Sequence, residues 1–161
     1  GGGGGDDCPD PLGACCFPGT ETVFLENGTV KRVEDVEIGD SILVADNDLK
    51  LKYSHVSFIP HKNNQINANY VRIYYTNSSG ENSSIAMTLH HYIPIPKKGN
   101  VFAKDVQIGE YIYTTSGMAK VVQKEEYTAN DGVYAFTTDY DYIVVNNVIA
   151  SAYDAEMTLY I

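Results

Sequence analysis

Positive charge is scarce in this sequence. Its 161 residues carry 11 lysines and arginines against 21 aspartates and glutamates, which gives a formal net charge of −10. Because no basic stripe is present that could neutralise phosphates, we expect no nucleic acid partner. No apolar run approaches the roughly 20 residues that a helix needs to cross a bilayer. The chain begins with glycine and has no positive n-region or apolar h-region behind it, so we expect a soluble piece of a longer protein without a membrane span.

Cysteine is scarce too, and its distribution is unusual. The three cysteines, Cys8, Cys15 and Cys16, all precede the part of the chain that we expect to fold. They are too few and too clustered for a disulfide framework, and no other ligand-rich spacing accompanies them, so we expect neither a metal site nor a resident cofactor. Two structural alternatives stay open: surface thiols, or a disulfide between Cys8 and Cys15 that leaves Cys16 reduced.

No stretch has the pattern of a helix of three turns. From Thr20 onward, short runs rich in Tyr, Val, Ile and Thr alternate with turn residues, which predicts an all-β domain. The segment from Gly1 to Ala14, with its five leading glycines, offers little to bury and should be a flexible linker. We therefore divide the chain into a flexible upstream segment at residues 1–15, the end of a released N-terminal part, and one folded domain at residues 16–161.

An eight-residue pattern occurs twice. The stretch from Asp35 to Ile42 (DVEIGDSI) is matched in step by the stretch from Asp105 to Ile112 (DVQIGEYI). The repetition predicts two copies of one supersecondary unit, related by pseudo-twofold symmetry within a single domain. We expect each copy to turn at its glycine, Gly39 or Gly109, with a backbone angle unfavourable to other residues. The alternative is two unrelated turns of common composition.

A stiff turn follows the last cysteine. In Cys16-Phe17-Pro18-Gly19, the proline restricts one backbone angle and the glycine permits the next, so the thiol can be presented in a set direction. Phe17 would anchor this turn in the core. A thiol placed between a flexible segment and a rigid turn favours self-cleavage of the backbone between Cys15 and Cys16, with the Cys16 thiol as the nucleophile.

Several motifs in order resemble one family. They are Cys16-Phe-Pro-Gly, the repeated DV-x-IG-[DE]-x-I element, Thr88-Leu-His-His91 and the segment 144–151 (VVNNVIAS). Together they resemble the autoprocessing domain of hedgehog proteins, which belongs to the Hint class shared with inteins. The resemblance covers roughly residues 16–153. It implies a compact all-β horseshoe of two pseudo-twofold related β-subdomains, in agreement with the repeat.

The resemblance also implies catalytic roles. Cys16 would attack the carbonyl of Cys15 and move the acyl chain from nitrogen to sulfur, which gives an internal thioester. His91 would donate a proton to the departing nitrogen, because imidazole titrates near neutral pH, and Thr88 would hydrogen-bond at the same amide. In a regular strand Thr88 shares a face with His90 and not with His91, so this pair requires a bend or bulge. Periodicity alone selects His90, the motif position selects His91, and ordinary strand histidines are the remaining alternative.

In hedgehog proteins a sterol hydroxyl then attacks the thioester, and this chain departs from that pattern in four places. His61 stands where the family has the aspartate thought to activate the sterol; a histidine can also act as a base. Ala152 replaces a later cysteine, Cys15 replaces a glycine before the nucleophile, and the chain stops at Ile161. We expect release by water or thiols from this chain, and sterol transfer only in a longer parent.

Two other function classes were weighed. Intein-like splicing needs a C-terminal asparagine followed by Ser, Thr or Cys, whereas Asn146 and Asn147 are followed by Val148. An intein-like cleavage domain without splicing is therefore the alternative within this fold. A catalytically silent β-module could instead bind a partner through a tyrosine-rich, acidic surface. For self-cleavage, the substrate is the upstream segment of the same chain, so we expect a monomer.

Three glycosylation triplets indicate a compartment. They begin at Asn27, Asn77 and Asn82 and would be glycan acceptors in a secreted protein. We therefore expect the secretory pathway or the extracellular space.

Overall fold

The computed structural model describes residues 16–152. The predicted flexible segment at residues 1–15 lies outside the described residues. Within residues 16–152 the regular structure consists of strands and two short 3-10 helices, η1 (Val33–Asp35) and η2 (Ala103–Asp105). The predicted all-β fold is confirmed, and no helix in the described part is long and apolar enough to span a membrane.

The strands divide into two halves of the chain. The first half contains β1 (Thr22–Phe24), β2 (Val30–Arg32), β3 (Ser41–Ala45), β4 (Leu51–His55), β5 (Phe58–Asn63), β6 (Ala68–Thr76) and β7 (Asn82–Thr88). The second half contains β8 (Tyr92–Ile95), β9 (Gly99–Phe102), β10 (Tyr111–Thr114), β11 (Gly117–Ala129), β12 (Val133–Thr137), β13 (Tyr142–Val145) and β14 (Val148–Ser151).

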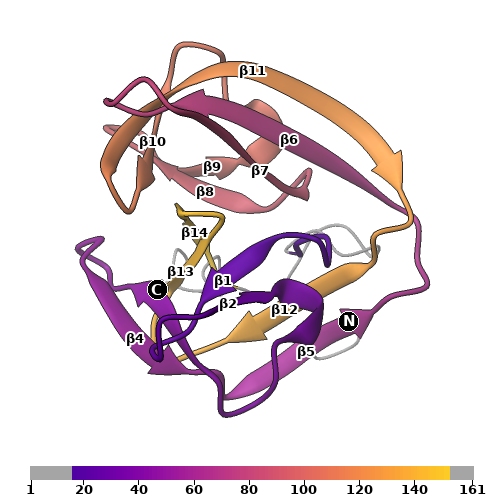
Figure 1. Cartoon of the computed structure of the whole chain (residues 1–161). Helices are drawn as coiled ribbons and strands as arrows, with labels where there is room; N and C mark the ends of the chain where they lie inside the picture. The colour runs from indigo at the N-terminus through magenta and orange to yellow at the C-terminus, as the bar shows by residue number, and fades with distance from the viewer. Residues whose placement is uncertain (1–15, 153–161) are drawn as a thin grey trace.

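Every strand pair in the described residues is antiparallel. Eight strands form one sheet in the order β4-β3-β13-β14-β10-β11-β6-β7, and three further pairs are β1-β2, β12-β5 and β8-β9. Strands β6 and β11 form a long curved ribbon in which Thr76 pairs with Lys120 and Ala68 with Ala129. Figure 1 shows this ribbon arching over one half of the molecule, while β5 and β12 continue the same two chain segments into the other half.

The repeated sequence element folds twice in the same way. Each copy is a strand, a 3-10 turn and a strand, and Gly39 and Gly109 have φ angles of 95° and 97°. These left-handed angles confirm the predicted glycine turns. The matched hydrogen bonds are Gly39 N–H to Val56 O and Gly109 N–H to Val121 O at 2.8 Å, and Glu37 N–H to Asp40 Oδ2 (2.9 Å) and Gln107 N–H to Glu110 Oε1 (2.8 Å). The two copies are therefore one unit used twice.

Two of the three hydrophobic clusters of the described residues, a main one and a smaller one, lie on the two faces of β12. Tyr134 and Phe136 belong to the main cluster, whereas Val133 and Ala135 belong to the smaller one. This division follows the two-residue alternation of a strand. Phe17 is 1% exposed and lies in the main cluster, so the predicted anchor of the turn is confirmed.

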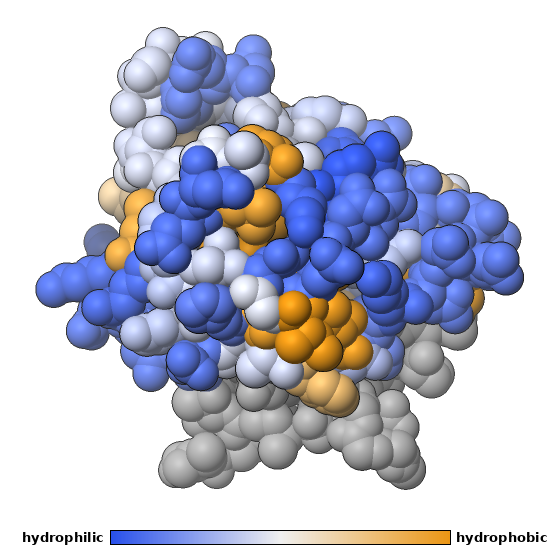
Figure 2. Space-filling view, turned by 60° about the horizontal axis from the view of Figure 1, so that its bottom comes forward, coloured by the Kyte–Doolittle hydropathy of each residue, from blue (hydrophilic) through white to orange (hydrophobic). Residues whose placement is uncertain are grey.

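The surface is mostly hydrophilic on the face drawn in Figure 2, where apolar side chains form a few separate patches. Large hydrophobic side chains with more than half of their surface exposed are Val30, Ile38, Phe58, Ile108 and Met118. They come from different elements of the fold. Single exposed apolar side chains of this kind are ordinary on soluble domains.

Candidate active site

Cys16 enters the fold immediately before a short pairing with β12. The N–H of Phe17 donates to the carbonyl of Tyr134 at 2.9 Å, and the N–H of Tyr134 donates to the carbonyl of Phe17 at 3.0 Å. Continuing this antiparallel register by one residue places Cys16 opposite Ala135. Cys16 is fully buried and belongs to the smaller cluster with Ala135 and Tyr70.

The turn after Cys16 is held by close packing. A Cβ atom at Gly19 would lie 2.8 Å from the ring of Tyr134 and 2.8 Å from the carboxylate of Glu34. The φ angle of Gly19 is not in the left-handed region. The sequence pattern predicts a glycine at position 19 for its backbone freedom. The structure gives a different reason, because a side chain at this position would clash with Tyr134 and Glu34.

Thr88 binds the backbone of Cys16 on both sides of its Cα atom. The N–H of Cys16 donates to Thr88 Oγ1 at 3.0 Å, and the same hydroxyl donates to the Cys16 carbonyl at 3.0 Å. The N–H of Thr88 also donates to this carbonyl at 3.0 Å. Thr88 ends β7, is 1% exposed, and pairs across the sheet with Tyr70. The nitrogen that Thr88 holds is the one that joins Cys15 to Cys16 in the chain.

A turn between β7 and β8 brings the backbone of His91 close to Thr88. Strand β7 ends at Thr88, β8 begins at Tyr92, and the N–H of His91 donates to the Thr88 carbonyl at 3.1 Å. This turn is the bend that the Thr88 and His91 pair required. The ring of His91 packs on Phe17, with the ring centroids 4.4 Å apart, and the residue is fully buried.

The His91 ring is fixed in one tautomer. Its Nε2 lies 2.8 Å from the carbonyl oxygen of Ser151. A carbonyl only accepts hydrogen bonds, so Nε2 carries the proton and Nδ1 is the unprotonated nitrogen of the neutral ring. Nδ1 is buried and makes no hydrogen bond with a described residue.

Burial lowers the pKa of His91 to about 4, and the backbones of Ser151 and Cys16 oppose this shift only in part. The ring is therefore neutral at neutral pH. The resemblance predicts a proton donor at this position, because an ordinary imidazole titrates near neutral pH. At this pKa, the ring must first take up the proton that it later donates.

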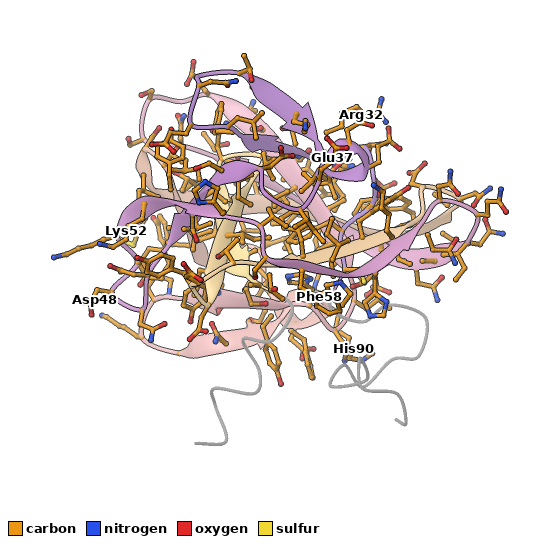
Figure 3. The ribbon with its side chains drawn as sticks, turned by 90° about the horizontal axis from the view of Figure 1, so that it is seen from below. Arg32, Glu37, Asp48, Lys52, Phe58 and His90 are labelled. Atoms are coloured by element: carbon orange, nitrogen blue, oxygen red, sulfur yellow. The ribbon has the colours of Figure 1, made fainter. Side chains whose placement is uncertain are left out.

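His90, the alternative selected by strand periodicity, has different surroundings. It is only partly buried, and its ring meets the edge of Phe102 at a centroid distance of 5.0 Å and an angle of 89°. Figure 3 shows His90 near the edge of the molecule. Of the two histidines, the one that shares contacts with both Phe17 and Ser151 is His91.

His61 lies on β5 in register with Cys16. It pairs with Ala135, which itself lies opposite Cys16, so the three residues form one row across neighbouring chain segments. The register of β5 and β12 shifts between Ala135 and Thr137, and the resulting bulge includes Pro60, which has no N–H for the ladder. Residues that pair across a ladder share a face, so His61, half-buried, is directed to the face that carries Cys16.

Ala152 and Cys15 are the other two positions that the sequence singled out. Ala152 is 2% exposed in the main core, and its N–H donates to the Asp141 carbonyl at 2.7 Å. Cys15, on the other side of the proposed scissile bond, lies outside the described residues. Residues 16–152 contain no cluster of three or more His, Cys, Asp and Glu side chains that could hold a metal ion.

Two contributors to the site were not singled out from the sequence. The backbone carbonyl of Ser151 orients His91, and a backbone group leaves no trace in residue type. Tyr70 packs in the cluster of Cys16 and donates its hydroxyl proton to the Gly132 carbonyl, and burial raises its pKa. Tyr70 belongs to the run YVRIYY at residues 70–75. This run predicts a strand but does not indicate which of its tyrosines lies near the site.

Comparison with known proteins places this site in a family. The model of the Hint module matches residues 12–158. Sonic hedgehog protein from Xenopus laevis is 26% identical in an alignment of length 151 that covers 86% of this chain and 33% of that protein. Warthog protein 6 from Caenorhabditis elegans is 29% identical in an alignment of length 151 that covers 88% of this chain and 24% of that protein. The chain thus spans a third or less of the length of these relatives.

Solved structures show the same fold. The crystal structure of a triple-substituted variant of the gp41-1 intein aligns with a TM-score of 0.68 at 15% identity, covering 84% of this chain and 98% of that chain. The solution structure of a bacterial intein-like domain from Clostridium thermocellum aligns with a TM-score of 0.65 at 19% identity, covering 85% of this chain and 98% of that domain. The fold, the order of the motifs and the family match agree: this chain belongs to the Hint family and has the Hint fold found in hedgehog proteins and inteins.

Proposed function

We propose that the chain cleaves itself between Cys15 and Cys16 through an N-to-S acyl shift. The observation that carries this proposal is the Thr88 hydroxyl on the Cys16 amide nitrogen, beside the buried neutral ring of His91. An amide is normally more stable than a thioester. The reaction therefore needs groups that hold the amide in place and supply a proton to its nitrogen.

The acyl shift balances with the groups present. Neutral His91 takes the thiol proton at Nδ1, and the sulfur bonds to the carbonyl carbon of Cys15. The bond from that carbon to the Cys16 nitrogen then breaks, and the imidazolium returns the proton to the departing nitrogen. The products are a thioester at the Cys16 sulfur and an amine at the Cys16 nitrogen, with no other reactant.

A second nucleophile then releases the upstream segment. We assign this role to water or a thiol in this chain, and to a sterol hydroxyl in a longer parent. His61, in register with Cys16 through Ala135, is the base that we propose for this step. The domain acts once on its own chain, needs no cofactor, and works as a monomer.

Splicing in the manner of inteins is not favoured. Asn146 and Asn147 form the turn between β13 and β14 with φ angles of 50° and 68°, and Val148 continues the chain as the first residue of β14. The amide of Asn146 is bonded to Glu21 and Ser84. These contacts support a structural role for this asparagine.

We also propose that processing takes place in the secretory pathway. The three glycosylation triplets support this, because Asn27 and Asn82 are exposed and Asn77 is half-exposed.

The test uses the full 161-residue chain. Incubation with dithiothreitol should release a fragment of residues 1–15, because a thioester yields to a thiol whereas an amide does not. The matched control is Cys16→Ala, which should stay intact. A wild-type chain that stays intact as well would support the alternative, a β-module that binds a partner.

A further inference from the structure

A buried carboxylate lies five residues after the nucleophile and is not used in the proposed chemistry. Glu21 is 3% exposed. Its Oε1 accepts hydrogen bonds from the Ala86 N–H at 2.7 Å and from Asn146 Nδ2 at 2.8 Å. Both carboxylate oxygens also meet the guanidinium of Arg72, at 3.3 Å each. A charge buried to this degree is stable only when it is fully bonded, and here each donor comes from a different element.

These donors lie beside the groups that hold the reactive amide. Ala86 is on β7, two residues before Thr88, and Arg72 pairs with Ala86 from β6. Two residues of a strand span roughly 7 Å. The Glu21 carboxylate therefore joins the segment that follows Cys16 to the strand that ends in Thr88.

Asn146 extends the connection to the histidine. Its Oδ1 accepts the N–H of Thr22 at 2.8 Å, and its Nδ2 donates to both Glu21 and the Ser84 carbonyl. Asn146 is in the turn from which β14 starts, and β14 ends at Ser151, whose carbonyl orients His91. The Glu21 carboxylate thus links three segments. They are its own segment, which follows Cys16, the strand that ends in Thr88, and the turn from which β14 leads to Ser151.

We propose that Glu21, with Arg72 and Asn146, is a positioning residue for self-cleavage: it sets the register of the Cys16 segment against Thr88 and His91. This inference rests on the proposed function. Displacements of about 1 Å at a reacting centre can lower rates by about 100-fold. Loosening these contacts should therefore slow the acyl shift in a protein that remains folded.

The test compares two identical changes at ion-paired carboxylates. In Glu21→Gln a single side-chain oxygen has to accept the hydrogen bonds that the two carboxylate oxygens accept in the wild type. The amide NH2 group that replaces the other oxygen is itself a donor and cannot accept a hydrogen bond from Arg72. Glu110→Gln is the matched control, because Glu110 bonds Lys98 and the Gln107 N–H in the second repeat, apart from these contacts. Cleavage in dithiothreitol should slow by about tenfold or more for Glu21→Gln and by less than about twofold for the control.

A second measurement distinguishes positioning from general destabilisation. The Cys16 amide resonance should shift, and its hydrogen exchange should accelerate, in folded Glu21→Gln but not in Glu110→Gln, because this N–H is bonded to Thr88. If Glu21→Gln does not fold, Asn146→Gly keeps the left-handed backbone and removes the bond to Glu21, and the same effects are expected. Equal rates and an unchanged Cys16 amide in either folded variant would overturn the inference. An intact wild-type chain would contradict the self-cleavage itself, and the amide measurement would still decide whether Glu21 positions Cys16.

Discussion

The Thr88 hydroxyl accepts a hydrogen bond from the Cys16 N–H and donates one to the Cys16 carbonyl, each at 3.0 Å. One side chain therefore fixes the backbone on both sides of the nucleophile. The bond to the N–H acts on the nitrogen that must leave during an acyl shift. The bond to the carbonyl, supported by the Thr88 N–H, holds the rest of the residue still.

Replacing Thr88 by valine should slow self-cleavage strongly. Loss of a buried hydrogen-bond partner costs about 1 to 3 kcal/mol, which corresponds to about 10- to 100-fold in rate when the bond persists in the transition state. Thr88→Ser keeps the hydroxyl and should retain most of the rate. Fragment release in dithiothreitol, followed by gel densitometry, measures both variants. Equal rates for valine and serine would show that the hydroxyl has no part in the reaction.

The two adjacent histidines should differ sharply. His91→Ala removes the proposed proton carrier, and acid–base groups of this kind contribute about 100- to 10,000-fold to rates. His90→Ala removes a ring that packs on Phe102, so it should cleave at nearly the wild-type rate. Single-turnover time courses of the two variants decide between them. The assignment fails if His91→Ala retains wild-type kinetics.

Stability should fall as the solution is acidified through the range in which an ordinary histidine titrates. The pKa of His91 is about 4 in the folded protein against 6.5 for the unperturbed side chain. Between these values the unfolded chain binds a proton that the folded protein excludes, so stability is lost as the pH falls from 6.5 to 4. The loss from this one group should approach about 3 kcal/mol.

Urea denaturation across this range measures that loss. His91→Gln should lack this part of the pH dependence, and subtracting its curve removes the contribution of acidic residues. A wild-type curve parallel to that of the variant would contradict a neutral, buried His91.

Changing His61 should affect the second step and leave the first intact. In His61→Ala, hydrolysis of the thioester without added thiol should slow by about 100-fold, because the water loses its base. Release by dithiothreitol at alkaline pH, where the thiol needs no base, should stay close to wild type. Mass spectrometry of the released fragment follows both reactions. An unchanged hydrolysis rate would remove His61 from the mechanism.

Local patterns predicted much of this fold because the residues concerned act locally. The repeated sequence around Gly39 and Gly109 predicted the two turns, and the succession of β-prone segments predicted the sheets. The prediction that Thr88 and His91 meet depended on the motif, since the turn that joins them interrupts a strand pattern that would have selected His90.

Other parts of the site depend on contacts between residues far apart in the sequence, which local sequence patterns do not predict. Ser151 acts through its backbone carbonyl, which is the same for every residue type. The residue type of Glu21 predicts a surface position, although its side chain is almost completely buried. The low pKa of His91 comes from complete burial, which only packing around the folded chain can produce. The pairing of His61 with Ala135 likewise depends on two strands that are far apart in the sequence.

The central claim is that an acyl group is held on the sulfur of Cys16, and trapping it with hydroxylamine at neutral pH tests this most directly. We predict a released fragment of residues 1–15 that ends in a hydroxamate at Cys15, identified by its mass, and no such product from Cys16→Ala. Hydroxylamine that leaves the wild-type chain whole, or a fragment from Cys16→Ala that carries the same hydroxamate, would contradict the account.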